Sequence, residues 1–157
     1  SQKYDLILFS ESFQYVNLGK SLYKIEKMLS LSGHLLICDF FRRDVPGRSP
    51  MGGGHSWNIF LETISKHPLN LVVDIDITKE TAPTIDLLEK FNADVLSPIA
   101  EMSGEYLISH YPKITKLLKW KFKKRLNKIH NIYLSGSVNG TSFKKFKEYH
   151  LLVYKKV

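Results

Sequence analysis

The stretch Tyr4-Asp-Leu-Ile-Leu-Phe-Ser-Glu-Ser-Phe-Gln-Tyr-Val16 decides the fold, because it begins as an apolar run and turns polar after Phe9. A continuous run of β-favouring residues without alternation is typical of a strand covered on both faces, as in a parallel sheet. Open parallel sheets bind their ligands beyond the carboxyl ends of the strands. We therefore expect a functional crevice at residues 10–14.

A helix and a second strand follow this stretch. Apolar residues recur at helical spacing from Leu18 to Leu31, lysines occupy the other face, and Gly33 stands where the C-cap of the helix is expected. The run HLLICDFF at residues 34–41 predicts another buried strand. Residues 4–41 therefore form one βαβ crossover with two parallel strands.

These stretches resemble a known family of enzymes. YDLILFSESFQYV, the helix and LSGHLLICDFF look like the fourth strand, fourth helix and fifth strand of class I S-adenosylmethionine-dependent methyltransferases. A helix, a sixth strand, a long helical segment and a terminal strand follow, so the resemblance covers nearly all 157 residues. It implies a partial Rossmann-like methyltransferase fold of the α/β class, with parallel strands, a C-terminal antiparallel pair and a helical lid inserted at about residues 79–149.

The family's Gly-rich loop and the acidic residue that ends its second strand have no counterpart in these 157 residues. We therefore interpret residues 1–157 as the C-terminal part of a single methyltransferase domain, from the fourth strand onward. Such a fragment is expected to be inactive alone and to bind S-adenosylmethionine poorly or not at all. Its strand at residues 4–9 would keep an unpaired edge, which predicts a homodimer or aggregation there.

The residues beyond the two strands are the predicted site of methyl transfer. The resemblance places the methionine part of the cofactor beside Ser10, Ser12, Phe13 and Gln14. Methyl transfer from a sulfonium needs an aligned nucleophile, exclusion of water and, for some acceptors, removal of a proton. The candidates for orienting or deprotonating an amine or hydroxyl acceptor are Glu11, Asp39 and His55. The predicted acceptor pocket contains Tyr15, Phe40 and Arg42.

Each catalytic candidate also has a structural interpretation. Glu11 and Asp39 are carboxylates at strand ends, where nearby helix N-termini can satisfy them. His55 lies on a glycine-rich loop at residues 42–56 that is expected to be mobile over the crevice. Either Ser56 or His55 can cap the helix that follows, and the structural interpretation of His55 is capping or plain exposure.

The sequence offers little for a metal site. Asp74 and Asp76 share one face of a strand at residues 71–78 whose second half nears a sheet edge. An exposed polar face or helix-end partners are favoured for them over a metal pair. The single cysteine, Cys38, excludes an internal disulfide and is expected to be buried in its strand. No zinc-ligand spacing occurs among the histidines.

Helices are expected from Thr81, with Pro83 in the first turn, and at residues 98–110, 112–130 and 141–149, before a last short strand at 151–154. From Lys113 to Lys147 there are eleven Lys or Arg residues and no Asp or Glu. The apolar residues of helix 112–130 share one face. We interpret the basic residues as the solvated sides of a packed helix, with an anion-facing role as the alternative.

Composition limits the class of protein. A chain with 43% apolar residues can bury one core, and no stretch reaches the ~20 apolar residues that span a bilayer. We expect a soluble, cytoplasmic protein. The first functional hypothesis is S-adenosylmethionine-dependent methylation of a small-molecule acceptor, with RNA as a less favoured acceptor. The second is a non-catalytic methyltransferase-like domain that binds a protein or nucleic acid through its basic helices. Neither a G-x-S-x-G elbow nor a dinucleotide fingerprint supports a hydrolase or reductase.

Overall fold

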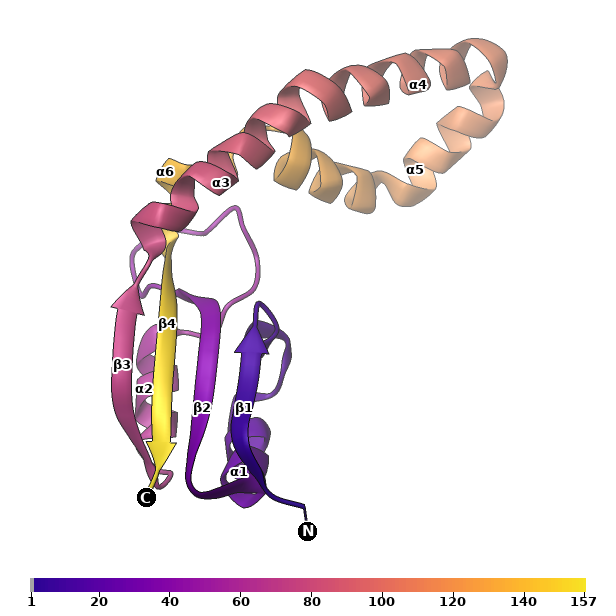
Figure 1. Cartoon of the computed structure of the whole chain (residues 1–157). Coiled ribbons are helices and arrows are strands. Elements are labelled where there is room, and N and C mark those ends of the chain that lie inside the picture. The colour runs from indigo at the N-terminus through magenta and orange to yellow at the C-terminus, as the bar shows by residue number, and fades with distance from the viewer. Residues whose placement is uncertain (1) are drawn as a thin grey trace.

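The centre of the molecule is a four-stranded sheet with the order β1-β2-β4-β3 (Figure 1). The computed structural model describes residues 2–157, except the side chain of Tyr133. The strands are β1 (Tyr4–Ser10), β2 (Leu29–Arg42), β3 (Leu69–Asp76) and β4 (Lys147–Lys156). β1 runs parallel to β2, whereas β4 is antiparallel to both β2 and β3. The expected crossover and the closing antiparallel pair at one sheet edge are both confirmed.

Two helices cover one face of this sheet, α1 (Leu18–Met28) and α2 (Trp57–Ile64) (Figure 1). The Asn17 side chain caps α1, and Ser56 rather than His55 caps α2 by accepting the Ile59 N–H at 3.4 Å. The main core lies between the helices and the sheet. Its fully buried members include Phe13, Leu22, Leu35, Ile37 and Phe60.

Most of the opposite face of the sheet carries no helix (Figure 1). Ile7 and Phe9 of β1 pack against the core, but Leu6 and Leu8 on the other side of the strand are 55% and 58% exposed. The prediction that this strand is covered on both faces is therefore wrong for the described residues. A continuous apolar run indicates that both faces of a strand could be buried, but it does not show that another element packs on each face.

The remaining helices form an arm that projects away from the sheet (Figure 1). This helical arm comprises residues 78–146, as α3 (Thr78–Phe91), η2 (Asn92–Leu96), α4 (Ser97–His110), α5 (Pro112–Ile129), η3 (His130–Leu134) and α6 (Gly140–Phe146), of which η2 and η3 are single π-helical turns. It is anchored by a second apolar cluster in which Phe40, Ala82, Phe143 and Tyr149 are buried.

The expected packing of the basic helix is wrong. In α5 only Thr115 is buried, and the apolar face that was expected to pack is largely exposed, with Ile114 at 59% and Leu118 at 46%. The reason is the projection of the arm, which leaves α4 and α5 in contact mainly with each other. Amphipathic spacing shows that a helix has an apolar face, but not that another element covers it.

Several boundaries differ from the predicted ones. α1 ends at Met28, and Gly33 lies inside β2, where an added Cβ would come within 3.1 Å of the Tyr4 carbonyl oxygen. α3 begins at Thr78 instead of Thr81, because the Asp76 carboxylate accepts the Thr78 N–H at 2.8 Å. This earlier start places Pro83 inside the helix rather than in its first turn. The expected helix at 141–149 ends at Phe146, since residues 147–150 pair with β2.

Candidate functional site

Two carboxylates lie where the parallel strands β1 and β2 end. The register pairs Ser10 with Cys38, so Glu11 follows β1 at the same sheet edge where Asp39 lies on β2. The Glu11 N–H donates to the Cys38 carbonyl at 2.9 Å and holds Glu11 at φ +49°, a left-handed conformation that is uncommon for residues other than glycine. Such strained positions concentrate at functional sites.

Asp39 is buried and organises the segment after β1. Its Oδ2 accepts the Gln14 N–H at 3.1 Å, and its Oδ1 accepts the Phe40 N–H at 2.8 Å and the Gln14 side-chain amide at 3.4 Å. Burial raises the pKa of Asp39, and the hydrogen bonds from these backbone amides oppose the rise. Because Gln14 belongs to the short 3-10 helix η1 (Phe13–Tyr15), Asp39 fixes that helix against the sheet, as its structural interpretation expects.

Glu11 is held by a tyrosine that the sequence analysis did not identify. The Tyr149 hydroxyl donates to Glu11 Oε1 at 3.1 Å, and the half-buried Cys38 places its Sγ 3.9 Å from the same hydroxyl. Burial and the neighbouring Cys38 and Glu11 groups raise the pKa of Tyr149, so it remains a neutral donor. Tyr149 was assigned to a helix, and only the pairing of Phe40 with Tyr149 across β2 and β4 reveals its position.

The glycine-rich loop is tied to the same site. His55 Nε2 lies 3.0 Å from the Phe13 carbonyl oxygen. Gly53 adopts φ +77°, a left-handed conformation that favours glycine, and a Cβ there would displace the end of the Gln14 side chain, whose Oε1 would lie 2.4 Å away. The buried Lys147 donates from Nζ to the carbonyl oxygens of Gly52 at 3.3 Å and Gly53 at 2.5 Å. This role of Lys147 could not be predicted from the expected helix at residues 141–149, because Lys147 is the first residue of β4.

The other predicted site residues lie in different environments. Phe13 is fully buried in the core, against Phe9 and Phe60, so only its backbone faces the crevice side. The side chain of Tyr15 is 80% exposed, whereas Phe40 is buried in the cluster that anchors the arm. Ser10, the last residue of β1, and Ser12 are both exposed, and the exposed Arg42 lines a hollow beside the glycine-rich loop. The structure thus joins Gln14 to Asp39, places the charge of Glu11 near them, and ties His55 to the backbone of Phe13.

The two aspartates of β3 have structural partners. Asp74 Oδ1 lies 2.6 Å from Nδ1 of His150, whose ring is stacked 4.2 Å from that of Trp57. Asp76 holds the backbone and the hydroxyl of Thr78. Across the described part of the chain, no group of three or more His, Cys, Asp or Glu side chains is arranged to hold a metal ion. No helix among those residues is long and apolar enough to cross a membrane.

Comparison with known proteins identifies the fold through structure alone, since no family model and no curated protein matches the sequence. An O-methyltransferase from the trans-AT PKS multienzyme of Brevibacillus brevis, in complex with S-adenosyl-L-homocysteine, is 18% identical with a TM-score of 0.55, over 100% of this chain and 45% of that one. The geranyl diphosphate C-methyltransferase of Streptomyces coelicolor A3(2) is 13% identical with a TM-score of 0.59, over 98% of this chain and 47% of that one.

The same fold also supports a different reaction. The cyclase SpnF is 13% identical with a TM-score of 0.55, over 99% of this chain and 51% of that one. The fold therefore does not by itself decide the chemistry. The chain spans about half the length of these solved structures. Within that span, it has the Rossmann-like fold of the S-adenosylmethionine-dependent methyltransferases.

Proposed function

We propose that this chain supplies the acceptor-side half of an S-adenosylmethionine-dependent methyltransferase that acts on a small molecule. The observation that carries the proposal is the position of Glu11, in a left-handed conformation at the carboxyl end of a parallel strand and hydrogen-bonded to Tyr149. The fold supports methyl transfer in general, because similar solved structures are methyltransferases for O- and C-acceptors.

The residues beyond β1 fit the amino-acid end of the cofactor. Ser10 and Ser12 are exposed, and among the described residues their hydroxyls have no hydrogen-bond partner. Gln14 is held in place by Asp39. These side chains would border the methionine part, with the backbone of Phe13 between them. When bound, S-adenosylmethionine supplies a methyl group that is already activated as a sulfonium.

Glu11 is the proposed group for orienting or deprotonating the acceptor. Tyr149 holds Oε1, whereas no described residue holds Oε2, which is left to accept a proton from an amine or hydroxyl. Asp39 is proposed as a positioning residue, since its oxygens are occupied by Gln14 and Phe40. His55 is a weaker candidate base, because the carbonyl of Phe13 holds its Nε2.

The uncovered face of the sheet supports the proposal that the chain acts as one half of a larger unit. Leu8, Leu36 and Val153 pair in register across three strands and form an apolar row on that face. Among the described strands β1 pairs only with β2, so its outer edge has free backbone donors and acceptors. A second half with its own strands and helices would cover both features.

The first experiment titrates S-adenosylmethionine calorimetrically into the 157-residue chain and into a version extended upstream of Ser1. Binding by the extended version alone is expected, because the Gly-rich loop that holds the cofactor in this family is absent from these residues. Retention of the fold by both versions is checked by circular dichroism. If neither version binds the cofactor, the proposed enzyme function is wrong.

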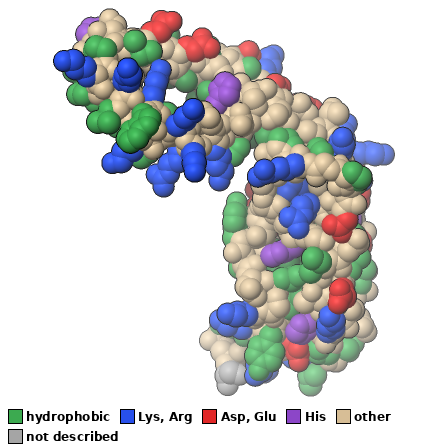
Figure 2. All heavy atoms as spheres, turned by 180° about the vertical axis from the view of Figure 1, so that it is seen from behind, with side chains coloured by type: hydrophobic (Ala, Val, Ile, Leu, Met, Phe, Trp, Pro, Cys, Tyr) green, Lys and Arg blue, Asp and Glu red, His purple; other side chains and the backbone are tan. Residues whose placement is uncertain are grey.

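A non-catalytic domain that binds a partner is the second candidate. The observation that favours it is the helical arm, where Trp120 is 76% and Met102 71% exposed beside many uncompensated lysines. Lys and Arg side chains gather along the arm and at its junction with the sheet (Figure 2). This function predicts partner binding that does not change when Glu11 is replaced.

A further inference from the structure

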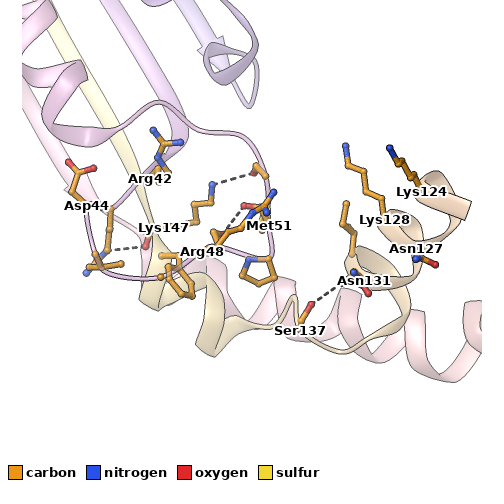
Figure 3. A pocket seen from close by; sticks show the side chains of 18 residues that line it. Arg42, Asp44, Arg48, Met51, Lys124, Asn127, Lys128, Asn131, Ser137 and Lys147 are labelled. Carbon is orange, nitrogen blue, oxygen red and sulfur yellow. Dashed lines mark hydrogen bonds between the residues drawn. The ribbon is translucent and has the colours of Figure 1, made fainter.

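A basic hollow of about 1050 Å³ lies between the glycine-rich loop and the helical arm (Figure 3). Arg48, Met51 and Lys147 lie on the side of the loop and β4, while Lys124, Asn127 and Lys128 face them from α5 (Figure 3). Six cationic residues line it: Arg42, Arg43, Arg48, Lys124, Lys128 and Lys147. The volume lies just above the usual range for small-molecule sites, roughly 300–1,000 Å³.

The positive charge around the hollow is mostly uncompensated. Asp44 is its one acidic lining residue, and its carboxylate already accepts the Ser56 hydroxyl at 3.2 Å. Arg43 is paired with Glu148 at 3.6 Å. Within the described residues, no carboxylate lies within 4.0 Å of the side-chain nitrogens of the four other exposed cations, Arg42, Arg48, Lys124 and Lys128. An anion in the hollow would relieve their mutual repulsion.

The arm contributes to the hollow with one helical face. Lys124, Asn127, Lys128 and Asn131 recur at spacings of three and four residues, which places them on one side of α5 and η3. The asparagines add neutral polar groups between the lysines. Arginine and lysine together suit phosphoryl oxygens, since arginine can donate two parallel hydrogen bonds and lysine a point charge.

The hollow adjoins the proposed methyl-transfer site through two consecutive glycines. Gly52 lines the hollow, whereas the Cα of Gly53 lies against the Gln14 side chain. Lys147 holds the carbonyl oxygens of both, and its Nζ lies 5.0 Å from the centre of the Phe40 ring. Burial, and then the charge of Arg42, lower the pKa of Lys147 to about 8.

We propose that this hollow binds a phosphate or diphosphate group carried by the methyl acceptor. The role as an acceptor site rests on the proposed methyltransferase function, whereas binding of the anion does not. A phosphoryl group held between Arg48 and Lys128 would leave the rest of the acceptor free to extend past Gly52 toward Gln14.

The test titrates inorganic pyrophosphate into the chain at constant ionic strength. Arg48→Gln combined with Lys128→Gln removes one charge from each wall of the hollow, and Lys113→Gln combined with Lys116→Gln removes two charges from the same helix outside it. We expect the first pair to weaken binding about tenfold or more, because charge-assisted hydrogen bonds are lost, and the second pair to weaken it less than about twofold. Equal weakening by both pairs, or no binding by the wild type, would overturn the site.

Two further ligands identify the source of the anion. A simple alkyl diphosphate should bind more tightly than pyrophosphate if the group belongs to an acceptor, and equal affinity would overturn the acceptor role. The third probe is a short single-stranded RNA. If it binds more tightly than pyrophosphate and the alkyl diphosphate, and if both variant pairs weaken its binding equally, the basic residues bind nucleic acid instead. Pyrophosphate binding is measured without S-adenosylmethionine. The anion site can therefore be disproved while the proposed methyltransferase function stands, and the reverse also holds.

Discussion

At the scale of single residues, His150 should make stability depend on pH. Burial by itself lowers the pKa of His150, but the carboxylates of Glu148 and Asp74 outweigh burial and raise it above its usual value. The folded protein therefore retains a proton that the unfolded chain releases near pH 6.5. This contribution to stability is complete below about pH 6.5 and is lost as pH rises through the raised pKa.

Replacing Asp74 tests this expectation. Asp74→Asn keeps a hydrogen-bond acceptor for Nδ1 of His150 but removes the negative charge that raises the pKa of His150. The free energy of unfolding should therefore fall less with rising pH than in the wild type. Urea unfolding between pH 5.5 and 8 measures the slope, which for one proton is at most about 1.4 kcal/mol per pH unit. From about pH 7 upward the slope also contains the opposite contribution of Lys147, whose pKa is lowered to about 8. The control is Glu62→Gln, which removes a carboxylate from an exposed ion pair. The prediction would be contradicted if the free energy of unfolding had the same pH slope in the wild type, Asp74→Asn and Glu62→Gln.

At the scale of elements, α3 and α6 contact each other where the arm meets the sheet. The Gly140 N–H donates to Asp86 Oδ1 at 2.6 Å, and a Cβ on Gly140 would lie 2.8 Å from the Ala82 carbonyl oxygen. Gly140→Ala should therefore separate the two helices and lower the free energy of unfolding by about 1–3 kcal/mol. Gly104→Ala on α4, with open space around it, should instead stabilise the protein by about 0.5–1 kcal/mol. Denaturation curves that shift in the same direction for both would contradict this role of Gly140.

The elements also show what sequence alone can predict. The crossover from β1 through α1 to β2 follows from local spacing and is correct, and of the two predicted caps for α2, His55 and Ser56, the structure has Ser56. Glu11 and Asp39 could be placed together because parallel strands end at one edge. Tyr149 and Lys147 could not, because their positions depend on pairing between β2 and β4, which are more than a hundred residues apart. Helical propensity in residues 147–149 gave way to that long-range pairing.

At the scale of the whole molecule, the two edges of the sheet differ in their tendency to associate. β3 carries Asp74 and Asp76, and its register is irregular between Leu71 and Val73, features that oppose pairing with another strand. The outer edge of β1 lacks these features over residues 6–9, where the leucines on the uncovered face are more than half exposed. We therefore expect the 157-residue chain to self-associate through β1.

Sedimentation velocity over a range of concentrations tests this expectation. Leu8→Lys places a charge on the uncovered face of β1 and should shift the chain toward monomer, because a charged lysine on an edge strand opposes pairing with another strand. Leu87→Lys adds the same charge on the arm, where the native leucine is 68% exposed, and should leave association unchanged. If the arm variant alone dissociates the protein, its exposed apolar helices are the contact. If β1 is the contact, the upstream extension used in the cofactor titration should also abolish association, because a neighbouring strand would then occupy the same edge.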